Sequence, residues 1–151
     1  MSVDKIRILP LQKNDLPAVL VIEQQSYPFP WSAEQFMQEQ RNPVASVDLL
    51  WVDRQLAGYI CYWLIAGEMQ VLNLATATDF RRQGIAGRLL AQAFSTAGKT
   101  GLEQAWLEVR AGNRAAIELY RQQGFVADSV RSGYYRDGED ALLMVRDFTG
   151  A

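Results

Sequence analysis

One short segment combines glycines and arginines in a pattern that suits binding of a diphosphate. It runs Arg81-Arg82-Gln83-Gly84-Ile85-Ala86-Gly87. An apolar, alternating stretch at 69–76 precedes it and apolar residues at helical spacing follow it, so the segment joins a strand to a helix. The first N–H groups of a helix are unpaired and partly positive, and glycines let an anion approach them closely. The alternative is that the glycines only permit the turn and the arginines are ordinary surface charge.

Glu108 is a second candidate, because it is a lone carboxylate in the otherwise apolar strand expected at 105–109. The chain contains no histidine, the commonest general base, so any base must be a carboxylate, a tyrosine, a lysine or water. A partly buried carboxylate can take a proton from an amine, directly or through water. The alternative is an edge carboxylate that pairs with Arg110 or with the backbone.

Aromatic residues gather in two segments that are expected to be loops. Tyr27-Pro28-Phe29-Pro30-Trp31 cannot continue a helix because two prolines interrupt it. The polar, glycine-rich segment 131–140 contains Tyr134 and Tyr135. These aromatic side chains either wall a substrate site or pack as lids on the core.

The composition favours one globular domain that spans residues 1–151. With 151 residues, of which 49% are hydrophobic and 21% charged, the chain fits a single core. Its net charge of −2 argues against general nucleic-acid affinity. We expect a cytoplasmic protein that uses no membrane, because there is no signal peptide and no apolar run of about 20 residues. The lack of histidine removes most zinc sites, so no metal is expected, and the single cysteine, Cys61, is expected to be a buried, inert thiol.

Strand and helix patterns alternate around these candidates. Strands are expected at 6–9, 44–52, 56–65 and 69–76, the last three as an antiparallel run. Helices are expected to begin near Asp15, after Ser32 in a capping box, at Ile85, and after Asn113 as a cap. Because a helix separates 69–76 from 105–109, these two strands are predicted to be parallel. Segments 125–130 and 141–145 are predicted to form a closing hairpin.

Several of these segments resemble one enzyme family. Residues 81–86 match the Arg/Gln-x-x-Gly-x-Gly/Ala pyrophosphate turn of the GNAT acyl-CoA-dependent N-acetyltransferases. Residues 107–125, LEVRAGNRAAIELYRQQGF, are similar to a block of the RimI-type ribosomal-protein alanine acetyltransferases within that family, as are Phe29-Pro30-Trp31-Ser32 and the segment from Arg131 to Met144. Thr78 departs from the family, in which a proline often precedes the turn; the change removes rigidity but no cofactor contact.

The resemblance implies an α/β GNAT fold. This is a mixed, mostly antiparallel sheet with a splay between two central parallel strands, where acetyl-CoA binds, and with helices on both faces. The implied reaction is acetyl transfer by direct attack, in a ternary complex, on a protein N-terminal α-amine, here the N-terminal alanine of the small-subunit ribosomal protein numbered eighteen. A monomer is expected. Transfer to a small amine or a lysine, and a non-catalytic acyl-CoA-binding module, are the alternatives.

The resemblance also implies roles for individual residues. Glu108 would be the general base. Tyr120, otherwise a half-buried core aromatic, would protonate the departing CoA thiolate, for which a hydroxyl of pKa about 10 is competent. Phe29, Trp31 and Tyr134 would line the acceptor site. The implied cofactor contacts are the backbone of Leu74, Ala75 and Thr76, the turn residues Arg81, Arg82, Gln83, Gly84, Ile85, Ala86 and Gly87, and Asn113.

Overall fold

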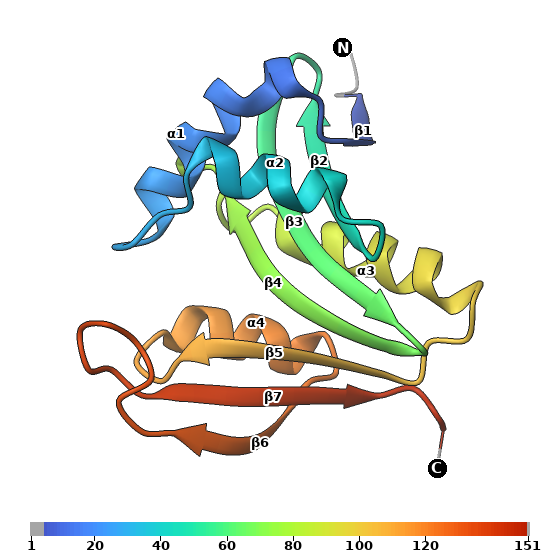
Figure 1. Ribbon diagram of the computed structural model, residues 1–151, viewed down its shortest axis with the longest axis vertical. Helices are drawn as coiled ribbons and strands as arrows, with labels where there is room; N and C mark the ends of the chain where they lie inside the picture. Colours follow the sequence, from blue (N-terminus) through green and yellow to red (C-terminus); the bar gives the residue numbers. More distant parts are fainter. Residues whose placement is uncertain (1–4, 151) are drawn as a thin grey trace.

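Strands and helices follow one another along the chain much as the sequence patterns predict. A computed structural model describes residues 5–150 (Figure 1). Its elements are β1 (Ile6–Pro10), a 3₁₀ turn (Lys13–Asp15), α1 (Leu16–Ser26), α2 (Ala33–Arg41), β2 (Ala45–Val52), β3 (Gln55–Ile65), β4 (Glu68–Thr76), a second 3₁₀ turn (Thr78–Phe80), α3 (Ile85–Gly98), β5 (Gln104–Arg110), α4 (Arg114–Gln122), β6 (Val126–Arg131) and β7 (Ala141–Asp147).

The strands form one mixed sheet in the order β1-β2-β3-β4-β5-β7-β6. Every neighbouring pair is antiparallel except β4 and β5, which are parallel. The predicted parallel pair, antiparallel run and closing hairpin are therefore confirmed. The crossover through α3 makes the parallel pair possible, because a tight turn cannot join two parallel strands.

The two parallel strands separate halfway along their length, as Figure 1 shows. Pairing begins at Glu68 with Gln104 and ends at Val71 with Leu107, although both strands continue beyond that point. The register of β4 against β3 shifts at the same place, because Tyr62 faces Val71 while Cys61 faces Asn73. Leu72 is thus the extra residue of a β-bulge, a feature that bends a strand and strengthens its twist. The bulge is a physical reason for the splay.

Helices cover both faces of the sheet. Helices α1 and α2 pack on one face through a buried cluster that includes Val19, Phe36 and Tyr59. Helix α3 packs on the other face through Leu89, Leu90 and neighbouring apolar residues, and α4 contributes partly buried side chains to this second cluster. The predicted fold class is confirmed in its strands, its splay and its helical layers.

The predicted local features of the helices and of Cys61 also agree with the structure. Ser32 accepts a hydrogen bond from the Gln35 N–H while Gln35 bonds back to the Ser32 N–H, which completes the predicted capping box. Asn113 caps α4 by accepting from the Ala116 N–H at 3.2 Å. Cys61 is buried, and burial raises the pKa of its thiol to about 12, as expected for an inert cysteine.

Gly58 of β3 lies against both β4 and α3. A Cβ atom at this position would lie 2.6 Å from the Ala75 carbonyl oxygen and 2.9 Å from Ile85 Cγ2. Gly58→Ala is therefore expected to lower the free energy of unfolding by about 1–3 kcal/mol, since backbone must move to make room. Thermal or denaturant unfolding measures this loss. Gly98→Ala on α3 is the control, because a Cβ there meets nothing within 4 Å; equal stability of both variants would contradict the close contact.

Candidate active site

The open end of β4 forms one wall of the splay. Leu74 and Ala75 are buried and Thr76 is partly buried, and all three lie beyond the last pair of β4 with β5. The hydroxyl of Tyr27, the residue that ends α1, donates to the Leu74 carbonyl oxygen at 2.6 Å. A protein donor thus already occupies the carbonyl of one of the three predicted backbone contacts. The sequence patterns did not indicate this role for Tyr27.

The turn before α3 has the geometry of an anion site. Gly84 is the N-cap with φ 77° and no side-chain cap, and a Cβ at Gly84 would meet nothing within 4 Å. The first N–H groups of α3 therefore have no side-chain acceptor at the cap and remain open to a ligand. Arg82 also has positive φ (63°), which is rare for an arginine and marks a turn that its surroundings hold in place. The donor set fits a diphosphate.

The other turn residues divide between the ligand side and the core. Arg81 and Arg82 are exposed, whereas the Gln83 side chain donates to the Asp79 carbonyl oxygen at 3.2 Å and so braces the turn. Ile85 is buried in the core, which leaves its backbone N–H, rather than its side chain, for a cofactor. Two small residues, Ala86 and Gly87, complete the first turn of the helix.

Glu108 lies on β5 just beyond the last parallel pair, at the opposite wall of the splay. Its side chain is 21% exposed, and Oε1 lies 3.5 Å from Nη1 of Arg131. A hydrogen bond with Glu108 is also the main cause that raises the pKa of Tyr134. The alternative pairing of Glu108 with Arg110 is wrong, because the guanidinium of Arg110 pairs with Asp137 and Glu139.

Tyr120 lies on α4. Its ring packs in the core, and its hydroxyl is a candidate proton donor. Its ring packs edge-on against Phe125, with centroids 6.0 Å apart. Burial, with a smaller effect of Tyr135, raises the pKa of Tyr120 to about 12, so the hydroxyl keeps its proton at neutral pH. Burial, and to a smaller extent Tyr120, also raises the pKa of Tyr27.

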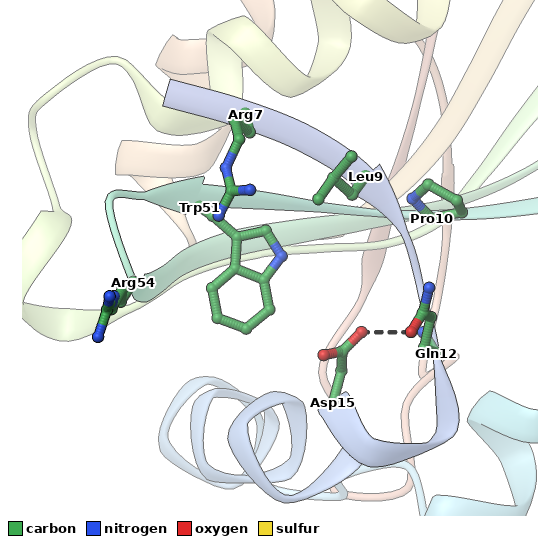
Figure 2. Close-up of a pocket in the computed structure, with 7 residues that line it drawn as sticks. All are labelled: Arg7, Leu9, Pro10, Gln12, Asp15, Trp51 and Arg54. Carbon is green, nitrogen blue, oxygen red and sulfur yellow. Dashed lines mark hydrogen bonds between the residues drawn. The ribbon is translucent and has the colours of Figure 1, made fainter. Parts of the chain in front are cut away.

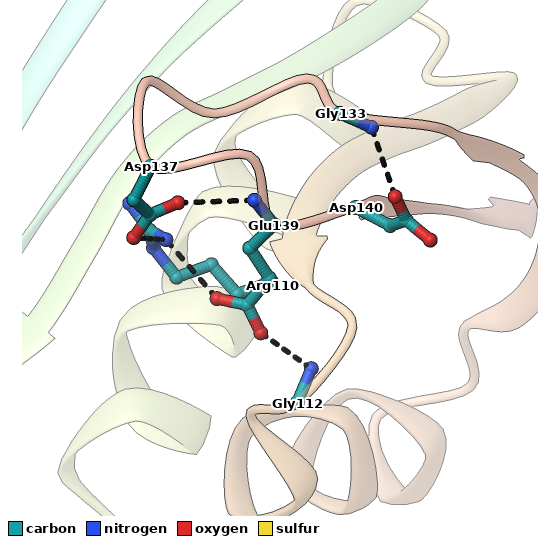
Figure 3. Close-up of polar contacts among 6 residues, drawn as sticks. All are labelled: Arg110, Gly112, Gly133, Asp137, Glu139 and Asp140. Carbon is teal, nitrogen blue, oxygen red and sulfur yellow. Dashed lines mark hydrogen bonds and ion pairs between the residues drawn. The ribbon is translucent and has the colours of Figure 1, made fainter.

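The connection between β6 and β7, residues 132–140, is tied to β5 by a polar network (Figure 3). Arg110 Nη1 lies 2.8 Å from Asp137 Oδ2 and 3.0 Å from Glu139 Oε1, while Glu139 Oε2 accepts from the Gly112 N–H at 2.9 Å. The Arg110 guanidinium also lies over the Tyr135 ring, 4.1 Å from its centroid. The Glu139 N–H and Arg110 lower the pKa of Asp137, so this link persists at pH values where an ordinary aspartate is protonated.

The aromatic residues of the loop at 27–31 have different surroundings. Phe29 is exposed, and the guanidinium of Arg136 lies 5.3 Å from its ring centroid, so this loop meets the β6–β7 connection. Trp31 instead packs against Phe36, with centroids 5.2 Å apart, as part of the cluster under α1 and α2. The contacts that the structure gives Trp31 are those of the packing alternative.

A separate hollow lies at the outer edge of the sheet, where β1 pairs with the strand that carries Trp51 (Figure 2). Arg7, Gln12, Asp15 and Arg54 are among its lining residues, and none of the predicted site residues is. Within residues 5–150, no cluster of three or more His, Cys, Asp or Glu side chains is arranged to hold a metal. In the same part of the chain, no helix is long and apolar enough to cross a membrane.

Comparison with known proteins gives one consistent match. The model of the acetyltransferase (GNAT) family matches residues 16–125. The [ribosomal protein bS18]-alanine N-acetyltransferase of Escherichia coli K12 is 36% identical over 137 residues, which cover 89% of this chain and 92% of that protein. The crystal structure of the ribosomal-protein-S18-alanine N-acetyltransferase from Escherichia coli superposes with a TM-score of 0.87 at 34% identity, covering 97% of this chain and 96% of that one. Arabidopsis thaliana NAA60 in complex with acetyl-CoA shares the fold, with a TM-score of 0.85 at 19% identity and coverages of 97% and 100%.

Proposed function

The chain belongs to the GNAT family of acetyltransferases, and we propose that it acetylates the N-terminal α-amine of a protein, namely the N-terminal alanine of ribosomal protein bS18. Acetyl-CoA is the acetyl donor. One observation carries the choice of acceptor: the Escherichia coli relative that modifies this alanine is similar over nearly the whole length of both chains. Under this proposal the enzyme works as a monomer in the cytoplasm, where ribosomal proteins are made, and binds no nucleic acid directly.

The groups available at the splay support acetyl-CoA as the ligand. The uncapped N-terminus of α3, with Gly84 open to approach and Arg81 and Arg82 exposed beside it, suits the pyrophosphate. The backbone of residues 74–76 on the splayed part of β4 suits the pantetheine amides, which would add to the open strand edge. Asn113, at the start of α4, is the remaining proposed contact.

Glu108 and Tyr120 carry the proposed proton transfers. The amine attacks the thioester carbon, a C–N bond forms and the C–S bond breaks. Glu108, on β5 at the mouth of the splay, takes the proton that the amine loses, directly or through water. Tyr120, which keeps its proton because its pKa is raised to about 12, protonates the leaving sulfur.

The acceptor site is proposed between the two loops that carry aromatic residues. Phe29 on one loop meets Arg136 on the other, and Glu108 raises the pKa of Tyr134 on that second loop. An N-terminal residue that enters between these loops would bring its amine to Glu108. Trp31 would support this wall from behind, through its packing on Phe36.

A panel of acceptors tests the proposal. Acetyl-CoA is incubated with the bS18 N-terminal peptide, peptides with other N-terminal residues, N-terminally blocked lysine peptides and polyamines, and products are identified by mass spectrometry. Acetylation confined to free alanine N-termini is the expected result. If only lysines or polyamines react, the acceptor is a lysine or a small amine and not an N-terminal alanine. If acetyl-CoA binds but no product forms, the result favours a non-catalytic binding module.

Arg110→Ala is expected to raise the KM for the acceptor peptide by about three- to tenfold, because charged hydrogen bonds of partly exposed groups hold the β6–β7 connection. The KM for acetyl-CoA is expected to stay unchanged, since Arg110 is not among the proposed cofactor contacts. Steady-state kinetics with each substrate varied in turn measures both values. Arg41→Ala is the control, because Arg41 forms an exposed ion pair with Glu34 on α2. Equal KM values for the Arg110 and Arg41 variants would contradict the role of this network.

A further inference from the structure

A buried carboxylate that the proposed chemistry does not use lies beneath the splay. Glu23 of α1 is 1% exposed, yet it contacts three separate elements. Its Oε1 accepts from the Tyr59 hydroxyl of β3 and from Nδ2 of Asn73 on β4, the latter at 2.7 Å. Its Oε2 accepts from the backbone N–H of Trp31 at 2.8 Å.

Both side-chain oxygens of Glu23 act as acceptors, because its three partners all donate hydrogen bonds in the structure. The Trp31 N–H can only donate, and the Asn73 nitrogen likewise has no acceptor capacity. A glutamine at this position would offer one oxygen and one NH₂ group, so at one end a donor would face a donor. Burying a carboxylate is costly unless hydrogen-bond donors compensate it, and here the protein supplies three donors, from β3, β4 and the loop after α1.

The two side-chain oxygens of Glu23 bond to two different parts of the proposed site, β4 at Asn73 and the acceptor loop at Trp31. Asn73 directly follows the bulge residue Leu72, where β4 leaves β5 and the proposed thioester site begins. Tyr27, one helical turn after Glu23, bonds the next residue, Leu74, so the end of α1 holds β4 at two successive positions. Trp31 lies in the same loop as Phe29, and this loop forms the proposed wall of the acceptor site.

We propose that Glu23 is a positioning residue for acetyl transfer, because its two oxygens join the acceptor loop at Trp31 to the β4 bulge at Asn73. This inference rests on the proposed function. Glu23 sets the distance between the incoming amine and the part of β4 that holds the thioester. It acts through backbone that it holds and does not contact the reacting atoms. Small misplacement of reacting groups is costly to turnover, even when it originates away from the chemistry.

The direct test is Glu23→Gln, with turnover expressed per acetyl-CoA-binding site as counted by calorimetric titration. We expect kcat per site to fall by about tenfold or more while acetyl-CoA affinity is unchanged. A merely structural defect would lower the number of binding sites but leave kcat per site intact. Glu39→Gln is the matched control, because Glu39 of α2 accepts from Nε1 of Trp63 on β3, at 2.6 Å, away from the splay. Unchanged kcat per site in Glu23→Gln, or equal losses in both variants, would overturn the inference.

A second variant and a second readout keep the test decisive. Asn73→Ala removes only the bulge end of the contact and is expected to lower kcat per site; if Glu23→Gln does not fold, an unchanged kcat in Asn73→Ala overturns the inference. Amide hydrogen exchange requires no acceptor: Glu23→Gln should speed exchange in both 27–36 and 72–76, and acceleration in one segment alone would count against the link. If the wild type acetylates no amine in the panel, the proposed function fails, while hydrogen exchange still decides whether Glu23 joins the two segments.

Discussion

Replacing Glu108 by glutamine is expected to lower kcat by about 10²- to 10⁴-fold, the usual contribution of a general base. The side chain keeps its size and its place on β5, but it can no longer take a proton. Binding of acetyl-CoA should be unchanged, because Glu108 lies on the opposite wall of the splay from the β4 backbone and the α3 turn. Steady-state kinetics with the alanine peptide and calorimetric titration with acetyl-CoA measure the two quantities.

The pH dependence gives this prediction a sharper form. An α-amine has a pKa of about 8, so below that value the enzyme must remove a proton before attack, and above it solvent has already done so. The defect of Glu108→Gln should therefore shrink as the pH rises through this range. Glu103→Gln, an exposed carboxylate just before β5, is the control and should behave as wild type. A defect that is the same at all pH values, or a loss of acetyl-CoA binding, would contradict the assigned role.

Tyr120→Phe is expected to lower kcat by about 10²-fold, since the leaving thiolate loses its proton donor. The ring should keep its packing against Phe125, so the free energy of unfolding should change little. Because burial raises the pKa of Tyr120 to about 12, the wild-type hydroxyl stays protonated through the alkaline range of an assay. Loss of this proton should therefore not reduce wild-type kcat until the pH approaches that value.

The control for this second prediction is Tyr62→Phe, which removes a hydroxyl from a buried tyrosine of β3 that is not assigned to the site. Its kcat should match that of the wild type. A Tyr120→Phe enzyme with normal turnover would leave Tyr120 as a packing residue only. A large fall in unfolding temperature that accompanies the loss of kcat would assign the effect to the core and not to proton transfer.

The predictions from sequence held best where a short segment determines its own structure. The capping box at Ser32, the cap at Asn113 and the helix that begins after Gly84 all depend on residues within a few positions of one another. The parallel pair followed from a helical pattern between two strand patterns. The family resemblance then pointed to the splay, and with it to both walls of the site, since the matching segments lie on the elements that form them.

The predictions failed or were silent where partners lie far apart along the chain. The pairing of Glu108 with Arg110, which was the alternative to a catalytic role, is wrong, because Glu108 meets Arg131. The acceptor role of Trp31 stays a prediction; the contact that the structure shows for its ring is with Phe36. Nothing in the local pattern marked Glu23, because a single glutamate on a helix usually faces solvent.

By itself, then, the sequence determined the order of strands and helices and the glycine turn before α3, because periodicity, caps and glycines act over a few residues; the acetyltransferase family came from the resemblance of several segments to known enzymes. Only the tertiary structure decided that Leu72 forms a bulge, since a register exists only between two paired strands. It also decided that Glu23 meets Asn73, 50 residues away. The reason is physical: a buried carboxylate takes the donors that chain packing brings to it, and no local pattern specifies which donors those will be.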